Sequence, residues 1–269
     1  LDVLLDGVIE NSGAFARVDQ PWGDAQLARL YDLFEFSEDV PMYLELAAET
    51  GGRVLEVACG SGRVLTQLVR AGFSVVGVDA SPHMLEQCRA KLNGGPAELV
   101  QADMRSFDVA GRSFDLAIVA VKSLCYLVEP ADQLACLQRI AEHLRHGGLL
   151  VLDLLHPRPD WVTAQPGVLR DDLLTTTPSG MVVSRVESVV RTDLAQQVRV
   201  TRSIYEVIDA HGKPVFKRMV EWPYRYIHRF EAEHLLARAG FRVEAVYGGY
   251  NREPFTSESA TMLFVAGRV

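Results

Sequence analysis

The chain has 269 residues, of which 48% are hydrophobic and 23% are charged, and these values are typical of one globular domain with room for an elaboration. Its formal net charge is −8 and it contains no dense run of Lys and Arg, which argues against DNA or bulk RNA as a partner. No apolar stretch approaches the roughly 20 residues that a membrane-spanning helix needs, which argues against an integral membrane protein.

The four cysteines show no pattern of metal binding. None has CxxC spacing or a neighbouring His, and a chain of this size does not need a disulfide framework. We therefore interpret them as reduced thiols of a cytoplasmic protein and expect no metal site: Cys59, Cys88, Cys125 and Cys136.

The N-terminal part is expected to be helical. Residues 24–36 carry apolar side chains at helical spacing, and Asp24 is suited to the N-cap. Residues 39–50 form a second predicted helix with Pro41 near its first turn.

Strand and helix patterns alternate from residue 54 to residue 155. Gly72 and Gly147 follow two of the predicted helices, as glycines do at helix ends. The alternation predicts a doubly wound, mostly parallel sheet. The predicted strands are 54–58, 74–78, 97–101, 114–121 and 149–155, and the predicted helices are 63–71, 81–92 and 130–145.

The pattern changes to strands with polar alternation from residue 168 to residue 227. Turn signals at 178–180, 193–196 and 209–212 divide this region into an antiparallel meander of three or four strands. A helix at 231–239 and two strands at 241–247 and 260–266 follow. The meander is thus predicted to be an insertion between the fifth strand and the next helix of the α/β fold.

An aromatic row occupies the end of the meander. With a period of two residues, one face of a single strand would carry Trp222, Tyr224, Tyr226 and His228. Such a row could line an acceptor pocket, form a dimer surface or pack in the sheet core.

The stretch "ACGSGRVL" identifies a ligand-binding loop after the first strand. Leu65 stands where a dinucleotide loop has its third glycine, and Glu56 in the preceding strand would repel a pyrophosphate. An anion there suits a ligand with a cationic amino-acid end. Asp79 ends the next strand and could accept hydrogen bonds from both ribose hydroxyls. The alternatives are that Gly60 and Gly62 serve only a turn and that Asp79 only caps the following helix.

The segment "VLEVACGSGRV" resembles motif I of class I S-adenosylmethionine (SAM)-dependent methyltransferases. The resemblance is close over about 53–156 and looser over 228–269. It implies an α/β, doubly wound, Rossmann-like sheet of seven mostly parallel strands with the antiparallel meander inserted. Within this family the sequence most resembles small-molecule methyltransferases that act on amino sugars, natural products or glycine. The implied division is a helical lid at 1–52, a SAM-binding domain at 53–158 and 228–269, and a substrate or dimer cap at 159–227.

The resemblance also implies a set of cofactor contacts, with S-adenosylhomocysteine as the product. For three of these residues simpler roles stay open: helix packing for Tyr31 and Met84, and an ordinary loop acid for Asp103. The implied contacts are Tyr31, Glu56, Ala58, Cys59, Gly60, Gly62, Asp79, Ala80, Met84, Ala102, Asp103, Met104, Ala120 and Val121.

Two residues after the fourth and fifth strands are candidates for catalysis. His156 could act as a general base, and Tyr126 matches an aromatic or His near cofactor and acceptor in related enzymes. Each could instead be a structural residue, since a neutral amine attacks the methyl group without a base. Lys122 stands where the family often has a small or amide residue.

The main functional prediction is methyl transfer to an N or O atom of a small molecule, such as a secondary metabolite or sugar nucleotide. The resemblance further implies that the insert covers the acceptor and can support a homodimer. The alternatives are a non-methylating, cyclase-like enzyme, a non-catalytic binding protein, and a peptide N-terminal methyltransferase. RNA methylation lacks both a basic tract and a base-amine motif after the fourth strand, where "AVKSLCY" stands.

Overall fold

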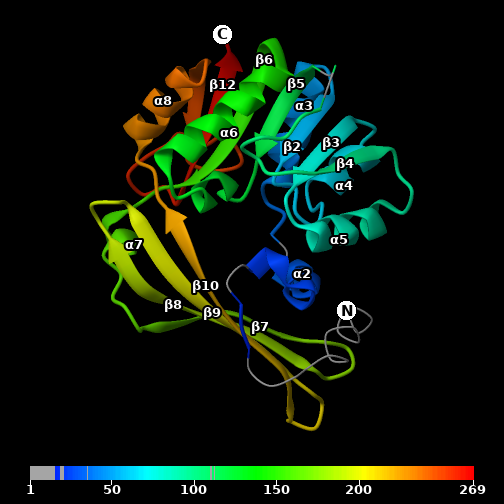
Figure 1. Cartoon of the computed structure of the whole chain (residues 1–269), viewed down its shortest axis with the longest axis vertical. Helices are drawn as coiled ribbons and strands as arrows, with labels where there is room; N and C mark the ends of the chain where they lie inside the picture. The colour runs from blue at the N-terminus through cyan, green and yellow to red at the C-terminus, as the bar shows by residue number, and fades with distance from the viewer. Residues whose placement is uncertain (1–15, 19–20, 35, 110, 112) are drawn as a thin grey trace. The chain divides into compact units, whose positions relative to one another are not determined.

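The computed structural model describes residues 16–18, 21–34, 36–109, 111 and 113–269, and these fall into two compact units (Figure 1). The larger unit contains Phe36–Arg158 and Arg225–Val269. The smaller unit combines the segment up to Glu35 with Pro159–Tyr224. Residues 36–52 thus belong to the larger unit, whereas the sequence analysis grouped all of 1–52 as a helical lid.

The larger unit is built on one seven-stranded sheet, as predicted. The strand order is β11-β12-β6-β5-β2-β3-β4. The neighbours from β6 to β4 are parallel, and β12 is antiparallel to both β6 and β11. The strands are β2 (Arg53–Val57), β3 (Ser74–Asp79), β4 (Ala97–Gln101), β5 (Phe114–Val119), β6 (Leu144–Leu155), β11 (Phe241–Tyr247) and β12 (Thr261–Arg268).

The order of the strands reverses between β2 and β5. The chain adds β3 and β4 on one side of β2 and then returns to place β5 on the other side. In an open parallel sheet, ligands bind outside the carboxyl ends of the strands at such a switch point. The edge formed by the loops after β2 and β5 is therefore the expected ligand site.

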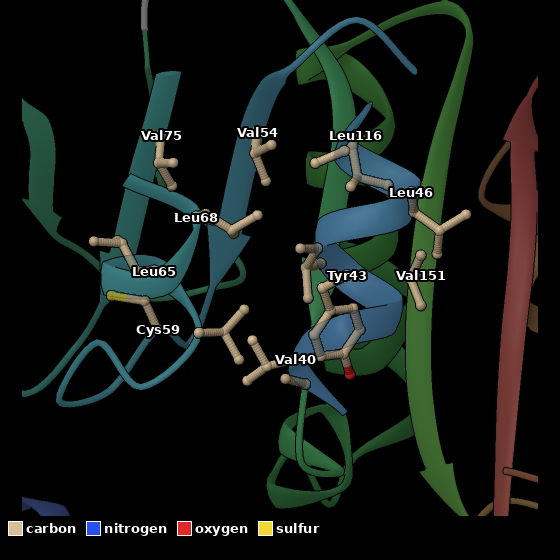
Figure 2. Packing of buried hydrophobic residues seen from close by; sticks show 14 of the residues in the cluster. Val40, Tyr43, Leu46, Val54, Cys59, Leu65, Leu68, Val75, Leu116 and Val151 are labelled. Carbon is tan, nitrogen blue, oxygen red and sulfur yellow. The ribbon is translucent and has the colours of Figure 1, made fainter. Parts of the chain in front are cut away.

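Helices cover both faces of this sheet. A single core cluster joins α3 (Val40–Thr50), α4 (Leu65–Arg70) and α5 (Pro82–Leu92) to one face, and Figure 2 shows side chains of α3 and α4 directed at the strands. On the other face α6 (Pro130–His143) contacts β6, and α8 (Arg229–Arg238) contacts β11 (Figure 1). No helix in the described part of the chain has the length and apolarity to cross a membrane.

The smaller unit holds the predicted meander between β6 and α8. Its strand order is β1-β10-β9-β8-β7, and β1 (Ala16–Val18) adds an unpredicted parallel strand from the N-terminal segment. The remaining elements are α7 (Pro159–Val162), β7 (Leu169–Thr176), β8 (Val182–Asp193), β9 (Val198–Ile208) and β10 (Pro214–Arg225).

The first predicted helix packs on this meander. It divides into α2 (Ala25–Tyr31) and a short 3₁₀ helix at Asp32–Phe34, and Asp24 caps α2 through its carboxylate, as expected. Leu27 and Leu30 of α2 share a core with the strands. A short N-terminal helix thereby buries its apolar side against the strands of the meander.

The predicted aromatic row is wrong as a single strand face. β10 ends at Arg225, because the chain turns there into α8, whose N-cap is His228. Tyr226 is buried beyond the strand. Trp222 stacks on Trp22 with ring centroids 6.5 Å apart. The aromatic residues therefore serve separate packing positions.

Candidate functional site

The loop between β2 and α4 depends on left-handed backbone at three positions. The φ angles are +58° at Ala58, +56° at Gly60 and +79° at Gly62. A Cβ atom at Gly62 would lie 2.4 Å from the Cys88 sulfur, so helix α5 leaves no room for a side chain there. A Cβ atom at Gly60 would meet nothing within 4 Å. Gly62 therefore serves packing, whereas Gly60 leaves open space at the edge of the sheet.

Asp79 joins the end of β3 to this loop. One carboxylate oxygen accepts a hydrogen bond from the Gly60 backbone N–H at 2.8 Å, and the other accepts one from the Ser81 N–H at 2.8 Å. Burial raises the pKa of this carboxyl above its usual value. Each oxygen accepts one of these bonds and a carboxylate oxygen can accept two, so capacity for two ligand hydroxyls is left.

Glu56 is a buried acid with an unsatisfied oxygen. It is 2% exposed, and its carboxylate accepts a hydrogen bond from the Leu65 backbone N–H. Its Oε2 atom has no hydrogen-bond partner in the described part of the chain. Burial raises its pKa to about 8, an effect that Arg63 opposes and that Asp39 and Asp79 reinforce. Such an acid fits the cationic amino-acid end of SAM.

The positive charge of Arg63 does not fully compensate the Glu56 carboxylate, because Asp39 binds the Arg63 guanidinium. The guanidinium contacts the two carboxylate oxygens of Asp39 at 2.5 and 2.6 Å, and it donates to the Phe36 carbonyl at 2.6 Å. Asp39 is completely buried. This pair fastens the glycine loop to the start of α3, and it was not predicted from the sequence.

The segment after β4 brings one of its three predicted residues, Ala102, to the end of β3. The Ala102 N–H donates to the Asp79 carbonyl at 3.0 Å, which puts Ala102 beside the end of β3. Asp103 follows, but its carboxylate is bound by Arg105 at 2.6 Å, and Arg105 lowers its pKa. Met104 is half-buried. Asp103 is thus already paired within its own turn.

Two further predicted residues lie at the start of the helix after β3. Met84 is 3% exposed in the first turn of α5, and its N–H donates to the Ser81 hydroxyl. Ala80 is exposed between β3 and that cap. Cys59 is buried in the glycine loop, and burial raises the pKa of its thiol. Its predicted contact with the cofactor stays a prediction.

The loop after β5 forms the other side of the switch point. Val121 and Lys122 both have left-handed backbone, with φ of +50° and +60°. The Ala120 carbonyl accepts hydrogen bonds from the Ser123 N–H and the Ser123 hydroxyl. The 3₁₀ helix η3 (Ser123–Tyr126) then carries Tyr126, which is half-buried.

His156 lies in the loop after β6. Its Nδ1 atom is 2.7 Å from the Ser259 carbonyl oxygen, and its ring packs edge-on against Phe255 with centroids 4.8 Å apart. The contact with a carbonyl assigns the hydrogen to Nδ1, which leaves Nε2 as a proton acceptor when the ring is neutral.

The larger unit therefore brings together the ends of β2, β3, β4 and β5 with their predicted residues. Tyr31 lies in the smaller unit, where its ring meets Trp22 edge-on at 5.1 Å. Its predicted contact with the cofactor stays a prediction. In the described part of the chain no three His, Cys, Asp or Glu side chains are grouped so that they could hold a metal ion.

Asp153 on β6 is a buried polar residue that the sequence analysis missed. It is completely buried and accepts hydrogen bonds from Val121, Tyr250 and Thr261. A signal was present, because Asp153 is the one acid in the apolar run "GLLVLDLLHP". Such an acid in a strand covered on both faces requires polar partners.

Comparisons with known proteins show which family of enzymes the chain resembles. Residues 54–148 match a family model described as a methyltransferase domain. The chain is 32% identical to the cypemycin N-terminal methyltransferase of Streptomyces sp over 81% of this chain and 84% of that protein. It is 29% identical to the dTDP-3-amino-3,4,6-trideoxy-alpha-D-glucopyranose N,N-dimethyltransferase of Streptomyces venezuelae, over 82% of this chain and 92% of that protein.

A solved structure extends the similarity to most of the chain. SAM-bound CalS10, an amino pentose methyltransferase of Micromonospora echinaspora, superposes with a TM-score of 0.67 and 26% identity. The match covers 87% of this chain and 92% of that one.

Proposed function

Because the chain belongs to the SAM-dependent methyltransferase family, we propose that it transfers the methyl group of SAM to an amino nitrogen of a small molecule. The observation that carries this proposal is the buried, unsatisfied Glu56 carboxylate beside the Asp79 carboxylate at the ends of two adjacent strands. These acids suit the two polar ends of SAM, the cationic amino-acid group and the ribose.

The cofactor site would be assembled mainly from backbone and carboxylates. Glu56 would face the amino-acid end, Asp79 would bind the ribose, and the open space at Gly60 would admit the ligand close to the chain. When bound, SAM supplies a methyl group already activated by its sulfonium. The protein would then need to align an acceptor with that methyl group and exclude water.

The choice of nitrogen over oxygen rests on the relatives. One relative is named as an N,N-dimethyltransferase of an amino sugar nucleotide, and another is named as an N-terminal methyltransferase of cypemycin. A neutral amine attacks unaided and loses its proton afterwards, whereas a hydroxyl needs a base. His156, with Nε2 as an acceptor, would receive that proton, and Tyr126 would line the acceptor side. The lid role of residues 1–52 and the cap or homodimer role of 159–227 stay predictions.

A peptide N-terminus is a second acceptor class. The 32% identity to the cypemycin N-terminal methyltransferase favours it, and an α-amine and a sugar amine present the same nucleophile. The two classes of acceptor differ in the molecule that carries the amine, which is a sugar linked to a nucleoside diphosphate in one class and a peptide chain in the other.

A methyl-transfer assay on the full chain would test the proposal. The protein would be incubated with SAM labelled in its methyl group and with three kinds of acceptor: amino sugar nucleotides, short peptides with free N-termini, and hydroxyl analogues of each. We expect label and a matching mass increase in the amines and none in the hydroxyl analogues. Transfer only to hydroxyls would reject the nitrogen assignment, and SAM binding without any transfer would favour a non-methylating protein.

A further inference from the structure

The turn after β5 has a backbone that its sequence does not favour. Val121 is β-branched and has a φ of +50°, a conformation in which such residues are outliers. Lys122 continues the turn with a φ of +60°. Backbone of this kind persists only where the surrounding structure holds it, and it is concentrated at functional sites.

This turn borders the switch point of the sheet. In the ladder between β2 and β5, Glu56 is paired with Ile118, two residues before Ala120. The turn therefore leaves β5 beside the strand end that carries the glycine loop. A ligand bound at the switch point would have the glycine loop on one side and this turn on the other.

A single buried carboxylate holds both residues of the turn. One oxygen of Asp153 accepts the Val121 backbone N–H at 3.1 Å and lies 3.2 Å from the Lys122 ammonium. It also accepts the Tyr250 hydroxyl at 3.0 Å, and the other oxygen accepts the Thr261 hydroxyl at 2.7 Å. The backbone of Val121 and the side chain of Lys122 thus converge on Asp153.

The same cluster reaches the glycine loop through an aromatic ring. The Lys122 ammonium is 3.1 Å from the Tyr250 hydroxyl and 6.0 Å from the centre of the Phe36 ring. The Arg63 guanidinium lies 5.6 Å from that ring centre. Phe36 therefore contacts cations from both sides of the switch point, one after β2 and one after β5.

We propose that Asp153 is a positioning residue for cofactor binding, which holds the Val121–Lys122 turn in the left-handed form that borders the SAM site. This inference rests on the proposed function, because it takes the switch point as the place of the cofactor. Asn cannot replace the acid fully, since one amide oxygen offers two acceptor positions where four donors converge. It would also leave the Lys122 ammonium without its opposite charge.

The test compares SAM binding with folding, because a merely structural role would change only the second. Asp153→Asn should raise the SAM dissociation constant about tenfold in calorimetry, the scale of one lost charge-assisted hydrogen bond. The matched control is Thr261→Val, which removes the donor from the other oxygen and should change that constant less than about twofold. An unchanged dissociation constant in the Asp153→Asn protein, with or without a lower melting temperature, would overturn the proposal.

A rescue variant makes the test specific for the turn. Glycine adopts left-handed backbone without strain, so Val121→Gly added to Asp153→Asn should recover most of the lost affinity. No recovery would assign the loss to another effect of Asp153. If Asp153→Asn fails to fold, Lys122→Met takes its place, with an expected increase of about threefold in the dissociation constant, and no increase would overturn the proposal.

A failure of the proposed methyl transfer can be distinguished from a failure of the proposed role of Asp153. Wild-type protein that binds SAM but methylates no acceptor would reject the proposed function, while the comparison of binding constants still decides the role of Asp153. Wild-type protein that binds no SAM would overturn both.

Discussion

The carboxylate of Asp79 accepts a hydrogen bond from the Gly60 backbone N–H at 2.8 Å, so the acid that ends β3 also holds the loop that follows β2. The second oxygen accepts the Ser81 N–H at the start of α5. One side chain therefore fixes the two backbone segments between which a ribose would lie.

Replacing Asp79 should weaken SAM binding. Asp79→Ala removes the proposed ribose acceptor and frees the glycine loop, and we expect a loss of about 1–3 kcal/mol in calorimetry with SAM or S-adenosylhomocysteine. Asp209→Ala is a control, since Asp209 closes an exposed turn of the meander through backbone hydrogen bonds. Equal affinity in the Asp79 variant and wild type would count against the ribose assignment.

Glu56 should couple SAM binding to pH. Its pKa is raised to about 8 in the empty protein from a usual 4.5, so at pH 7 most molecules carry a proton there. A cationic ligand group favours the carboxylate, and binding should therefore release a proton. The affinity should rise with pH towards about 8, by at most about tenfold per pH unit. Burial is the main cause of the raised pKa of Glu56; Arg63 and the Leu65 backbone N–H oppose it, and Asp39 and Asp79 add to it.

The raised pKa of Glu56 has the opposite effect on the stability of the SAM-free protein, which falls as pH rises. The folded chain holds the proton more tightly than the unfolded chain, so the contribution of Glu56 to stability is lost as pH rises from about 4.5 to about 8.

The release of a proton on SAM binding can be measured directly by calorimetry in two buffers of different ionisation enthalpy. Glu56→Gln should abolish that release, and a heat of binding independent of buffer in wild type would contradict the prediction.

Much of the fold was predictable because its signals are local. The strand and helix periods, the cap at Ser81 and Gly72 after α4 agree with the structure. The helix predicted over 130–145 is too long, because α6 ends at His143 and β6 begins at Leu144, so Gly147 lies within β6 and not at a helix end. The β1 strand and the packing of α2 on the meander could not be predicted, because a short strand and a short helix acquire their positions only from partners distant in the sequence.

The candidate site divides in the same way. The glycine loop and the acids at the strand ends follow one another at recognisable spacing. The Arg63–Asp39 pair and the Asp153 cluster join residues more than 20 positions apart, and such pairing leaves no periodic trace in one sequence. The lone acid in an apolar strand was the available clue.

The two loop glycines should fail in different ways when replaced. Gly62→Ala places a methyl group 2.4 Å from the Cys88 sulfur, and we expect a clear loss of melting temperature. Gly60→Ala meets no atom within 4 Å, so only the left-handed backbone opposes it, at a cost of about 1–2 kcal/mol. Its main effect should be on SAM affinity, because the methyl group occupies the open edge.

Thermal unfolding and calorimetry on both glycine variants separate these outcomes. Gly72→Ala is a matched control, since Gly72 also has positive φ and open space but lies at the other end of α4. It should lower stability as much as Gly60→Ala while leaving SAM affinity unchanged. Equal affinity losses for Gly60→Ala and Gly72→Ala would remove Gly60 from the proposed site.

His156 can be tested without disturbing its anchor. In His156→Asn the side-chain amide can still donate to the Ser259 carbonyl, as Nδ1 does, but the acceptor corresponding to Nε2 is lost. If His156 takes the acceptor's proton as the methyl group is transferred, turnover should fall by roughly 10²-fold or more, while the SAM dissociation constant and melting temperature stay near wild type. His211→Asn, in an exposed turn, controls for a general effect of losing a histidine. Full turnover in His156→Asn would identify the amine as able to react and lose its proton to water, and His156 would then be a residue of loop structure alone.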